Sequence, residues 1–219
     1  TLQINNDEPI AEFAVGKIKE AWSECAEETA GEYFVNIGRD TALNDEAYSL
    51  KLTGDTIKIT GGNGVGALYG GYELAEQIKL HGIDNIREKA ESPRFPFRAI
   101  KFNLPWSAYR DHEVVYQHRE IVKDLEYWEQ FMDMMIENRF NVLTLWSLHP
   151  FTYMFRPTNY PEACGFSDEE LAQWQAFWTS LFKMARDRGI ETYMVWWNIF
   201  VSPEFAEHHQ VSDYSKSLS

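Results

Sequence analysis

Hydrophobic residues along positions 1–92 recur with two different periods, which predicts a small domain of mixed strands and helices. Short apolar runs predict strands at residues 2–5, 33–37, 47–52 and 56–60. Apolar residues at helical spacing predict helices at residues 9–28 and 67–80. Gly54-Asp55 separates the last two strands and favours a β-hairpin. The order strand, helix, three strands, helix is typical of a compact two-layer α/β domain.

The pattern changes after residues 91–96 (ESPRFP), whose prolines indicate a linker. Strands and long helices then alternate. The predicted elements are strand 97–104, helix 120–138, strand 141–148, helix 167–188 and strand 190–197. Ser167 and Glu170 have the spacing of a capping box, which begins the second of these helices. Long helical connections imply parallel strands joined by right-handed crossovers.

We therefore expect an α/β protein with two domains. Residues 1–92 would form a small two-layer α/β accessory domain, and residues 93–219 the first three β/α units of a (β/α)8 (TIM) barrel. A complete barrel needs roughly 250 residues, about twice the length of this second segment. Three parallel strands cannot close a barrel, so we expect the barrel to be incomplete in this chain.

Charge and aromatic content narrow the classes of partner. Lys and Arg total 20 against 34 Asp and Glu, which gives a net charge of −14. Such a surface repels phosphate backbones and anionic lipids, so we expect neither nucleic acid nor a membrane as partner. Most of the 8 tryptophans lie in the second half of the chain. An indole can stack on a pyranose ring, but Trp128, Trp174 and Trp178 lie in the predicted helices and are expected to pack there.

The glycine-rich run at residues 61–71 resembles a phosphate-binding loop only superficially. It lacks the Lys-Ser/Thr of a P-loop, and no distant carboxylate completes a dinucleotide-binding fingerprint. We interpret it as a tight strand-to-helix turn.

Polar and aromatic residues gather where the parallel strands of the second segment are predicted to end. These residues are Asn103 and Trp106, then Trp146, Ser147 and His149, then Trp196, Trp197 and Asn198. In parallel α/β barrels the chemistry lies at the carboxyl ends of the strands. A ring for stacking beside groups that bind hydroxyls is what a sugar requires. The alternative is that such residues only satisfy backbone groups of the loops.

No pair of carboxylates of the kind that hydrolyses glycosides lies at these strand ends. Glu204 is the nearest carboxylate to a strand end, and it is expected to lie at a helix cap. The histidines show no HxH or HExxH arrangement, so we expect no metal site, and we interpret His208-His209 as a solvated turn.

The order of these parts resembles that of secreted glycoside hydrolases whose α/β domain precedes a (β/α)8 barrel, among them family 67 α-glucuronidases, family 20 β-hexosaminidases and family 84 relatives. The stretch AYSLKLTGDTIKITGGNGVGALYGGYELAEQI resembles the end of their first domain, and ESPRFPFRAIKFN their linker and first barrel strand. ARDRGIETYMVWWNIFVSP resembles the third-strand segment of the α-glucuronidases.

This resemblance carries over only a few residues. Arg98 matches the position of an arginine that holds sugar hydroxyls in the hexosaminidases, and Asn103 stands where they have Asp. Trp146 occupies the place of one of their histidines, and their pair of aspartates on the second strand is absent. These departures favour resemblance to the α-glucuronidases, or to a less studied relative, over the hexosaminidases. The substrate-binding residues expected on this basis are Arg98, Asn103, Trp146, His149, Trp197 and Asn198.

The resemblance implies a glycoside hydrolase acting on poly- or oligosaccharides without a cofactor, with its catalytic carboxylates expected beyond Ser219 and this segment alone inactive. A β-N-acetylhexosaminidase-like enzyme and a non-catalytic carbohydrate-binding module remain alternatives. The expected partners are the carbohydrate substrate and either the remainder of its own barrel or a second copy of the chain. The resemblance also implies a secreted or periplasmic protein.

Overall fold

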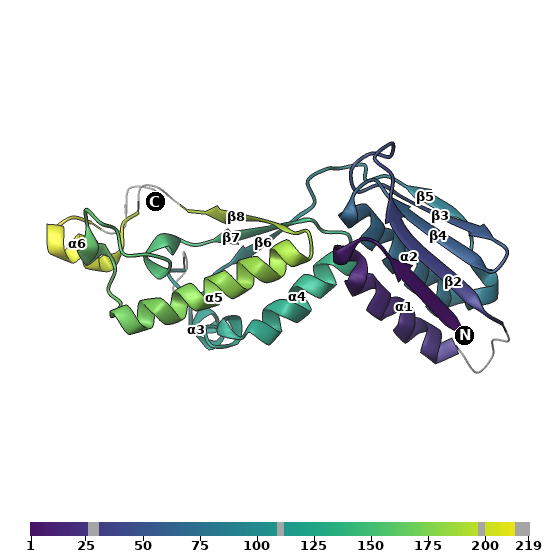
Figure 1. Ribbon diagram of the computed structural model, residues 1–219. Helices are drawn as coiled ribbons and strands as arrows, with labels where there is room; N and C mark the ends of the chain where they lie inside the picture. Colours follow the sequence, from purple (N-terminus) through teal and green to yellow (C-terminus); the bar gives the residue numbers. More distant parts are fainter. Residues whose placement is uncertain (26–30, 109–111, 197–199, 213–219) are drawn as a thin grey trace. The chain divides into compact units, whose positions relative to one another are not determined.

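The computed structural model describes residues 1–25, 31–108, 112–196 and 200–212 (Figure 1). Contacts divide the chain into two compact units, one made of Thr1–Phe97 with Ile136–Arg139, the other of Arg98–Met135 with Phe140–Ser219. The mixed α/β class that the sequence predicts is confirmed, since each unit combines a sheet with helices. In the part of the chain that the structure describes, no helix is both long and apolar enough to cross a membrane.

The first unit has a five-stranded sheet with the strand order β1-β2-β4-β3-β5. Its strands are β1 (Leu2–Asn6), β2 (Tyr33–Arg39), β3 (Tyr48–Thr53), β4 (Thr56–Gly61) and β5 (Lys89–Glu91). Its helices are α1 (Glu12–Cys25), α2 (Gly64–His81) and the 3-10 turns η1 (Pro9–Ala11) and η3 (Ile83–Asn85). Pairing of β1, β2 and β4 is parallel, whereas β3 pairs antiparallel with β4 as the predicted hairpin requires. The predicted end of the first helix, residues 26–28, lies outside the described residues.

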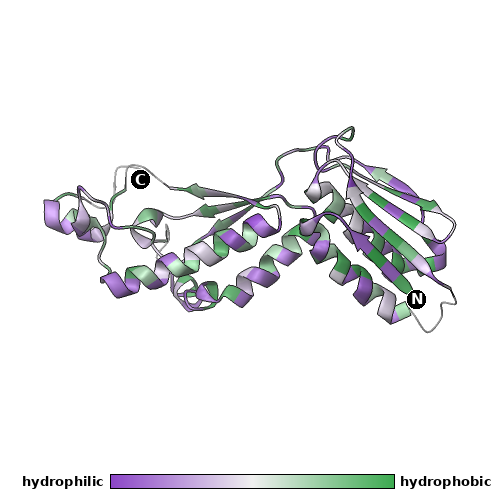
Figure 2. Cartoon of the chain, in the orientation of Figure 1, coloured by the Kyte–Doolittle hydropathy of each residue, from purple (hydrophilic) through white to green (hydrophobic). Residues whose placement is uncertain are grey.

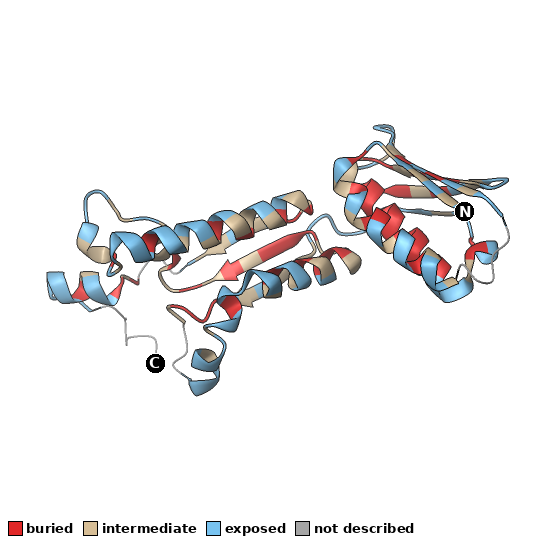
Figure 3. Cartoon of the chain, turned by 60° about the horizontal axis from the view of Figure 1, so that its bottom comes forward, coloured by how far each residue is buried: buried red, intermediate tan, exposed pale blue. Residues whose placement is uncertain are grey.

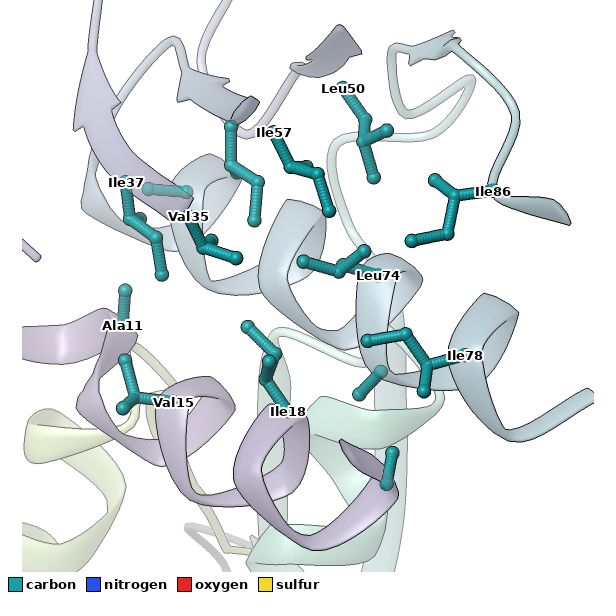
Figure 4. Packing of buried hydrophobic residues seen from close by; sticks show 14 of the residues in the cluster. Ala11, Val15, Ile18, Val35, Ile37, Leu50, Ile57, Leu74, Ile78 and Ile86 are labelled. Carbon is teal, nitrogen blue, oxygen red and sulfur yellow. The ribbon is translucent and has the colours of Figure 1, made fainter. Parts of the chain in front are cut away.

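One face of this sheet is apolar because its strands alternate. Val35 and Ile37 on β2 and Ile57 and Ile59 on β4 are all buried, and the residues between them face the opposite side. Helices α1 and α2 cover the apolar face, and Ile18 of α1 is fully buried there (Figure 4). The alternation is visible as bands of opposite hydropathy along the strands (Figure 2). This core holds the two helices against one face of the sheet.

Strand β5 is not predicted by the sequence pattern, because Lys-Ala-Glu has no apolar alternation. A buried carboxylate on α2 stabilises this segment instead. Glu73 is only 7% exposed and accepts hydrogen bonds from Lys89 Nζ (2.9 Å), Gln77 Nε2 (2.9 Å) and the Tyr48 hydroxyl (3.0 Å). Burial raises the pKa of Glu73, but these three donors outweigh it and leave the pKa below its ordinary value. The ionised carboxylate therefore connects α2 to β3 and β5.

The glycine run forms the tight strand-to-helix turn that the sequence predicts. The Asn63 side chain caps α2 by accepting a hydrogen bond from the Gly66 amide at 2.9 Å. Backbone packs directly against backbone here: a Cβ on Gly62 would lie 1.9 Å from the Asn44 carbonyl oxygen, and one on Gly66 2.3 Å from that of Ala47. These glycines are required for close approach to the loop before β3.

The second unit has a three-stranded parallel sheet in the order β6-β7-β8 (Figure 1). Its strands are β6 (Ala99–Asn103), β7 (Val142–Trp146) and β8 (Glu191–Val195). Its helices are α3 (Glu113–Gln117), α4 (Leu125–Glu137), α5 (Asp168–Asp187) and α6 (Pro203–His209), with 3-10 turns η4 (Ile121–Lys123), η5 (Pro150–Tyr153) and η6 (Pro161–Ala163). The capping box at Ser167 and Glu170 is confirmed. Helix α3 is an addition that the sequence pattern does not predict, whereas α6 begins where Glu204 is expected to lie at a helix cap.

The helix predicted from residue 120 begins later than expected. Asp124 has an extended backbone (φ −73°, ψ 121°), and its carboxylate accepts a hydrogen bond from the Glu126 amide at 2.9 Å. This local bond competes with helix formation at Asp124, so α4 begins only at Leu125. The preceding residues form the separate turn η4.

Aromatic residues fill the space between this sheet and its helices. Phe102 of β6 contacts the rings of Tyr127, Trp128 and Phe131 on α4. Trp128 is fully buried and its indole N–H donates to the Val122 carbonyl at 2.7 Å, and Trp178 is also buried. Their predicted packing role is confirmed. Burial is concentrated on the middle strand and on the inward sides of the helices (Figure 3).

A buried arginine at the end of α5 joins the two crossover helices. The Arg188 side chain is 4% exposed, and its Nε lies 2.6 Å from Asp133 Oδ1 on α4. Its other nitrogens bond Glu129 at 3.4 Å and the Met184 carbonyl at 3.3 Å. Because burying a charge without partners is costly, this network fixes α4 against the end of α5.

We expect Gly62→Ala to lower the free energy of unfolding by about 2 kcal/mol or more, since the new methyl would overlap backbone that cannot yield. Gly16→Ala is the matched control. That glycine lies exposed in the middle of α1, where a new methyl would meet nothing within 4 Å, and alanine there should stabilise by about 0.5–1 kcal/mol. Urea denaturation followed by far-ultraviolet circular dichroism measures both, and equal effects would contradict the close-approach argument.

We expect Asp133→Asn to destabilise the protein by about 2–3 kcal/mol, because it leaves the Arg188 guanidinium buried beside a neutral partner. Asp187→Asn is the control. Asp187 is about as exposed as Asp133 (36% against 38%), but its partner Lys183 is 64% exposed. Removing that pair should change the midpoint of thermal unfolding little, because solvent screens an exposed ion pair. Thermal unfolding compares the two variants, and a similar loss in both would show that the burial of Arg188 is energetically unimportant.

Candidate functional site

The register of the parallel sheet brings the carboxyl ends of β6, β7 and β8 to one edge. Asn103 pairs with Trp146, and Trp146 pairs with Val195. The same register places the last residues of all three strands side by side. This is the edge at which the sequence predicts a binding site.

Hydrogen bonds between two of these loops hold the edge in a defined shape. The Leu104 amide donates to the Trp146 carbonyl at 2.8 Å, and the Leu148 amide donates to the Ser107 carbonyl at 3.1 Å. The buried Ser147 hydroxyl lies 3.1 Å from the Trp106 carbonyl and also contacts the Ser107 hydroxyl. Ser107 adopts a left-handed backbone (φ 48°), a conformation that these bonds maintain.

A pocket of about 610 Å³ opens beside this edge. Its floor comes from the ends of β6 and β7, and its walls from α3, η4 and the first turn of α4. Most of the lining is apolar. The polar and aromatic groups that face it are Lys101, Asn103, His118, Tyr127, Trp146 and Ser147. A largely apolar pocket with a few polar groups is the usual form of a small-molecule site.

The indole of Trp146 is fixed at the floor of this pocket. Its N–H donates to the Thr144 hydroxyl at 3.0 Å, and the Lys101 ammonium lies 4.2 Å from the ring centroid. Burial raises the pKa of Tyr127, so its phenol is protonated at neutral pH and can both donate and accept a hydrogen bond. The pocket thus combines an oriented ring, a cation and neutral hydrogen-bonding groups.

The structure brings together only some of the residues that the sequence singles out. Asn103 and Trp146 share the pocket, whereas His149 borders a separate hollow of about 240 Å³ that Trp196 also lines. Arg98 precedes β6, so it lies at the opposite end of the strand from Asn103 and does not join this group. Trp197 and Asn198 lie outside the described residues.

Among the described residues that line the pocket, none carries a carboxylate. Glu204 lies in the first turn of α6, where the helix is capped by the Ser202 hydroxyl, which accepts from the Phe205 amide at 3.3 Å. The described part of the pocket can therefore bind and orient a ligand, but it does not by itself contain a pair of acid and base groups.

Sequence reasoning misses three residues of the pocket. Lys101 is missed because it lies inside a predicted strand. Its neighbour Phe102 packs against α4, so Lys101 points to the opposite face of the sheet. His118 enters the sequence argument only among the histidines that show no metal-ligating arrangement, and Tyr127 only as part of a helix. A signal for Lys101 does exist, since a charged residue two positions before Asn103 shares its face of the strand.

No protein-family model matches the chain. Among curated proteins, the chain is similar to alpha-glucuronidase A of Aspergillus tubingensis (24% identity over 122 residues) and to a probable alpha-glucuronidase A of Aspergillus niger (25% over 122 residues). Each of these matches covers 53% of this chain and 14% of the relative. The aligned segment is thus a small part of those proteins.

Among solved structures, a GH138 enzyme targeting pectin rhamnogalacturonan II matches with a TM-score of 0.80 and 25% identity, over 97% of this chain and 26% of the other. A glycoside hydrolase family 20 β-N-acetylglucosaminidase matches with a TM-score of 0.57 and 12% identity, over 89% of this chain and 37% of the other. The second likeness shows the fold alone. These findings relate the chain to glycoside hydrolases, as the sequence resemblance implies.

Proposed function

We propose that this chain forms part of a glycoside hydrolase and that the pocket at Asn103 and Trp146 is a sugar subsite. The observation that carries the proposal is the in-register pairing of these two residues at the carboxyl edge of a parallel sheet. An indole offers a surface for a pyranose ring, and the amide beside it can bind a hydroxyl. The likeness to the GH138 enzyme and to the α-glucuronidases supports the reaction class.

The two faces of the three-stranded sheet support a barrel in the complete protein. On one face Leu143 and Leu145 are fully buried under the helices. On the other face lie the register partners Lys101, Thr144 and Tyr193, and Tyr193 is 46% exposed. Parallel sheets are normally covered on both faces. We propose that β6, β7 and β8 belong to a (β/α)8 barrel and that this polar and aromatic face lines the interior of the barrel.

An acidic sugar is the substrate that we propose. The named activity of the similar curated proteins is α-glucuronidase, and the Lys101 ammonium beside the Trp146 ring could pair with a uronate carboxylate. An N-acetylhexosaminide is the alternative, supported by the family 20 fold at a lower TM-score. In both cases we propose hydrolysis by two carboxylates without a cofactor. We propose that these carboxylates lie outside the residues described in this chain.

We expect Trp146→Ala, made in the complete protein that contains this chain, to lower kcat/KM about 10- to 100-fold through lost stacking. The assay uses an aryl α-glucuronide and, in parallel, an aryl β-N-acetylhexosaminide. Trp22→Ala is the matched control, because Trp22 is also half-buried but lies on α1 in the other unit. Lys101→Met should lower kcat/KM for the acidic substrate only.

Equal kcat/KM values for Trp146→Ala and the unsubstituted protein would refute the subsite. Hydrolysis of the N-acetylhexosaminide alone would refute the acidic sugar but keep the reaction class. If the complete protein binds sugars saturably but hydrolyses neither substrate, the proposal of an enzyme is wrong and the protein is a carbohydrate-binding module.

A further inference from the structure

The loops that follow β7 and β8 meet at a point away from the pocket. The turn η6 belongs to the loop after β7, and helix α6 follows β8. The Ser202 hydroxyl at the start of α6 donates to the Ala163 carbonyl at 2.7 Å, and the ring of Tyr160 packs edge-on against Phe205 at 5.5 Å between centroids. These contacts hold the two loops together by polar and apolar interactions.

Two histidines and a carboxylate converge where these loops meet. His209 Nε2 lies 2.7 Å from Glu162 Oε1, and one ligand atom from each of Glu162, His208 and His209 lies within 4.8 Å of the other two. Glu162 comes from η6 and both histidines from α6. The side chains remain accessible, with 35% of His209 and 23% of Glu162 exposed, so an ion could enter from solvent.

The backbone of α6 accounts for this convergence, which the sequence does not predict. His208 and His209 are exposed, as the interpretation as a solvated turn expects, but they lie in the last turn of α6 and not in a loop. Ser202 caps the helix and Pro203 is its first residue, which favours helix formation up to the left-handed Gln210. The ring of His209 is oriented by Phe205, whose centroid lies 4.2 Å away, and by Tyr160 at 6.0 Å.

We infer that Glu162, His208 and His209 form a binding site for a divalent transition metal of the zinc class. Two imidazoles and one carboxylate are a ligand set that zinc commonly uses, with a fourth position open to water. Nitrogen ligands disfavour Mg²⁺ and Ca²⁺, which prefer oxygen. Zinc ligands at their usual bond lengths are about 3.3 Å apart in a tetrahedron. The 2.7 Å between His209 Nε2 and Glu162 Oε1 would therefore widen, and distances near the 4.8 Å limit would shorten, through side-chain rotations.

The charges around the site favour a cation. Glu162 Oε1 lies 2.7 Å from His209 Nε2, so an acidic oxygen faces the imidazole directly. The chain as a whole carries a net charge of −14. A bound metal would connect the loop after β7 to the helix after β8, and would thereby fix two of the loops that follow the carboxyl edge of the sheet.

The test is a titration of the 219-residue chain, prepared without a histidine tag, with Co²⁺ as the probe. We expect visible d–d absorption that saturates at one equivalent, and a bound Co²⁺ that Zn²⁺ displaces. Calorimetry with Zn²⁺ should give an affinity that falls at least about 10-fold in each of His208→Gln, His209→Gln and Glu162→Gln. His81→Gln is the matched control, since His81 also lies exposed in the last turn of a helix.

Absence of saturable Co²⁺ absorption would overturn the site. Binding that His209→Gln abolishes but His208→Gln leaves unchanged would overturn the three-ligand arrangement. Circular dichroism of each variant checks that the fold is retained, because these side chains are at least partly exposed and their replacement should leave the spectrum unchanged. None of these outcomes depends on the glycosidase proposal, which is tested at a different pocket.

Discussion

The parallel, in-register pairing of β6, β7 and β8 is the constraint on which the candidate site depends. Parallel strands can be joined only by long crossovers, and here α4 and α5 provide the two connections. Every strand therefore ends at the same edge, and each loop that leaves that edge can contribute to one region. A shift of one residue in the register would turn Asn103 and Trp146 toward the helices, since neighbouring residues of a strand face opposite sides.

The helices must in turn be held against the sheet, and different forces act in the two units. In the first unit a nearly continuous apolar cluster does so, together with glycines that let backbone approach backbone. In the second unit the contacts are more aromatic, and the buried Arg188 adds a polar connection between α4 and α5. A rigid scaffold below the strand ends allows the loops above them to vary without loss of the fold.

The proposed subsite and the proposed metal site are separate in the second unit and have different chemistry. The pocket at Trp146 is largely apolar with one cation and several neutral polar groups, which suits a sugar. The group at Glu162, His208 and His209 is accessible and rich in nitrogen ligands, which suits a metal. The first lies at the strand ends, and the second is formed by η6 and α6.

The sequence by itself determined the alternation of strands and helices, the hairpin at Gly54-Asp55, the glycine turn and the capping box at Ser167, because each depends on local periodicity or on local backbone chemistry. The incomplete barrel and the division at residue 92 stay predictions. Only the tertiary structure decided which strand-end residues meet. Asn103 and Trp146 are far apart in sequence and become neighbours through the register, whereas Arg98 lies at the far end of the strand. Likewise β5 depends on Lys89 reaching Glu73, and the cluster of Glu162 with two histidines depends on the packing of α6 against η6. Local patterns cannot encode such contacts, because they arise from the pairing and packing of segments distant along the chain.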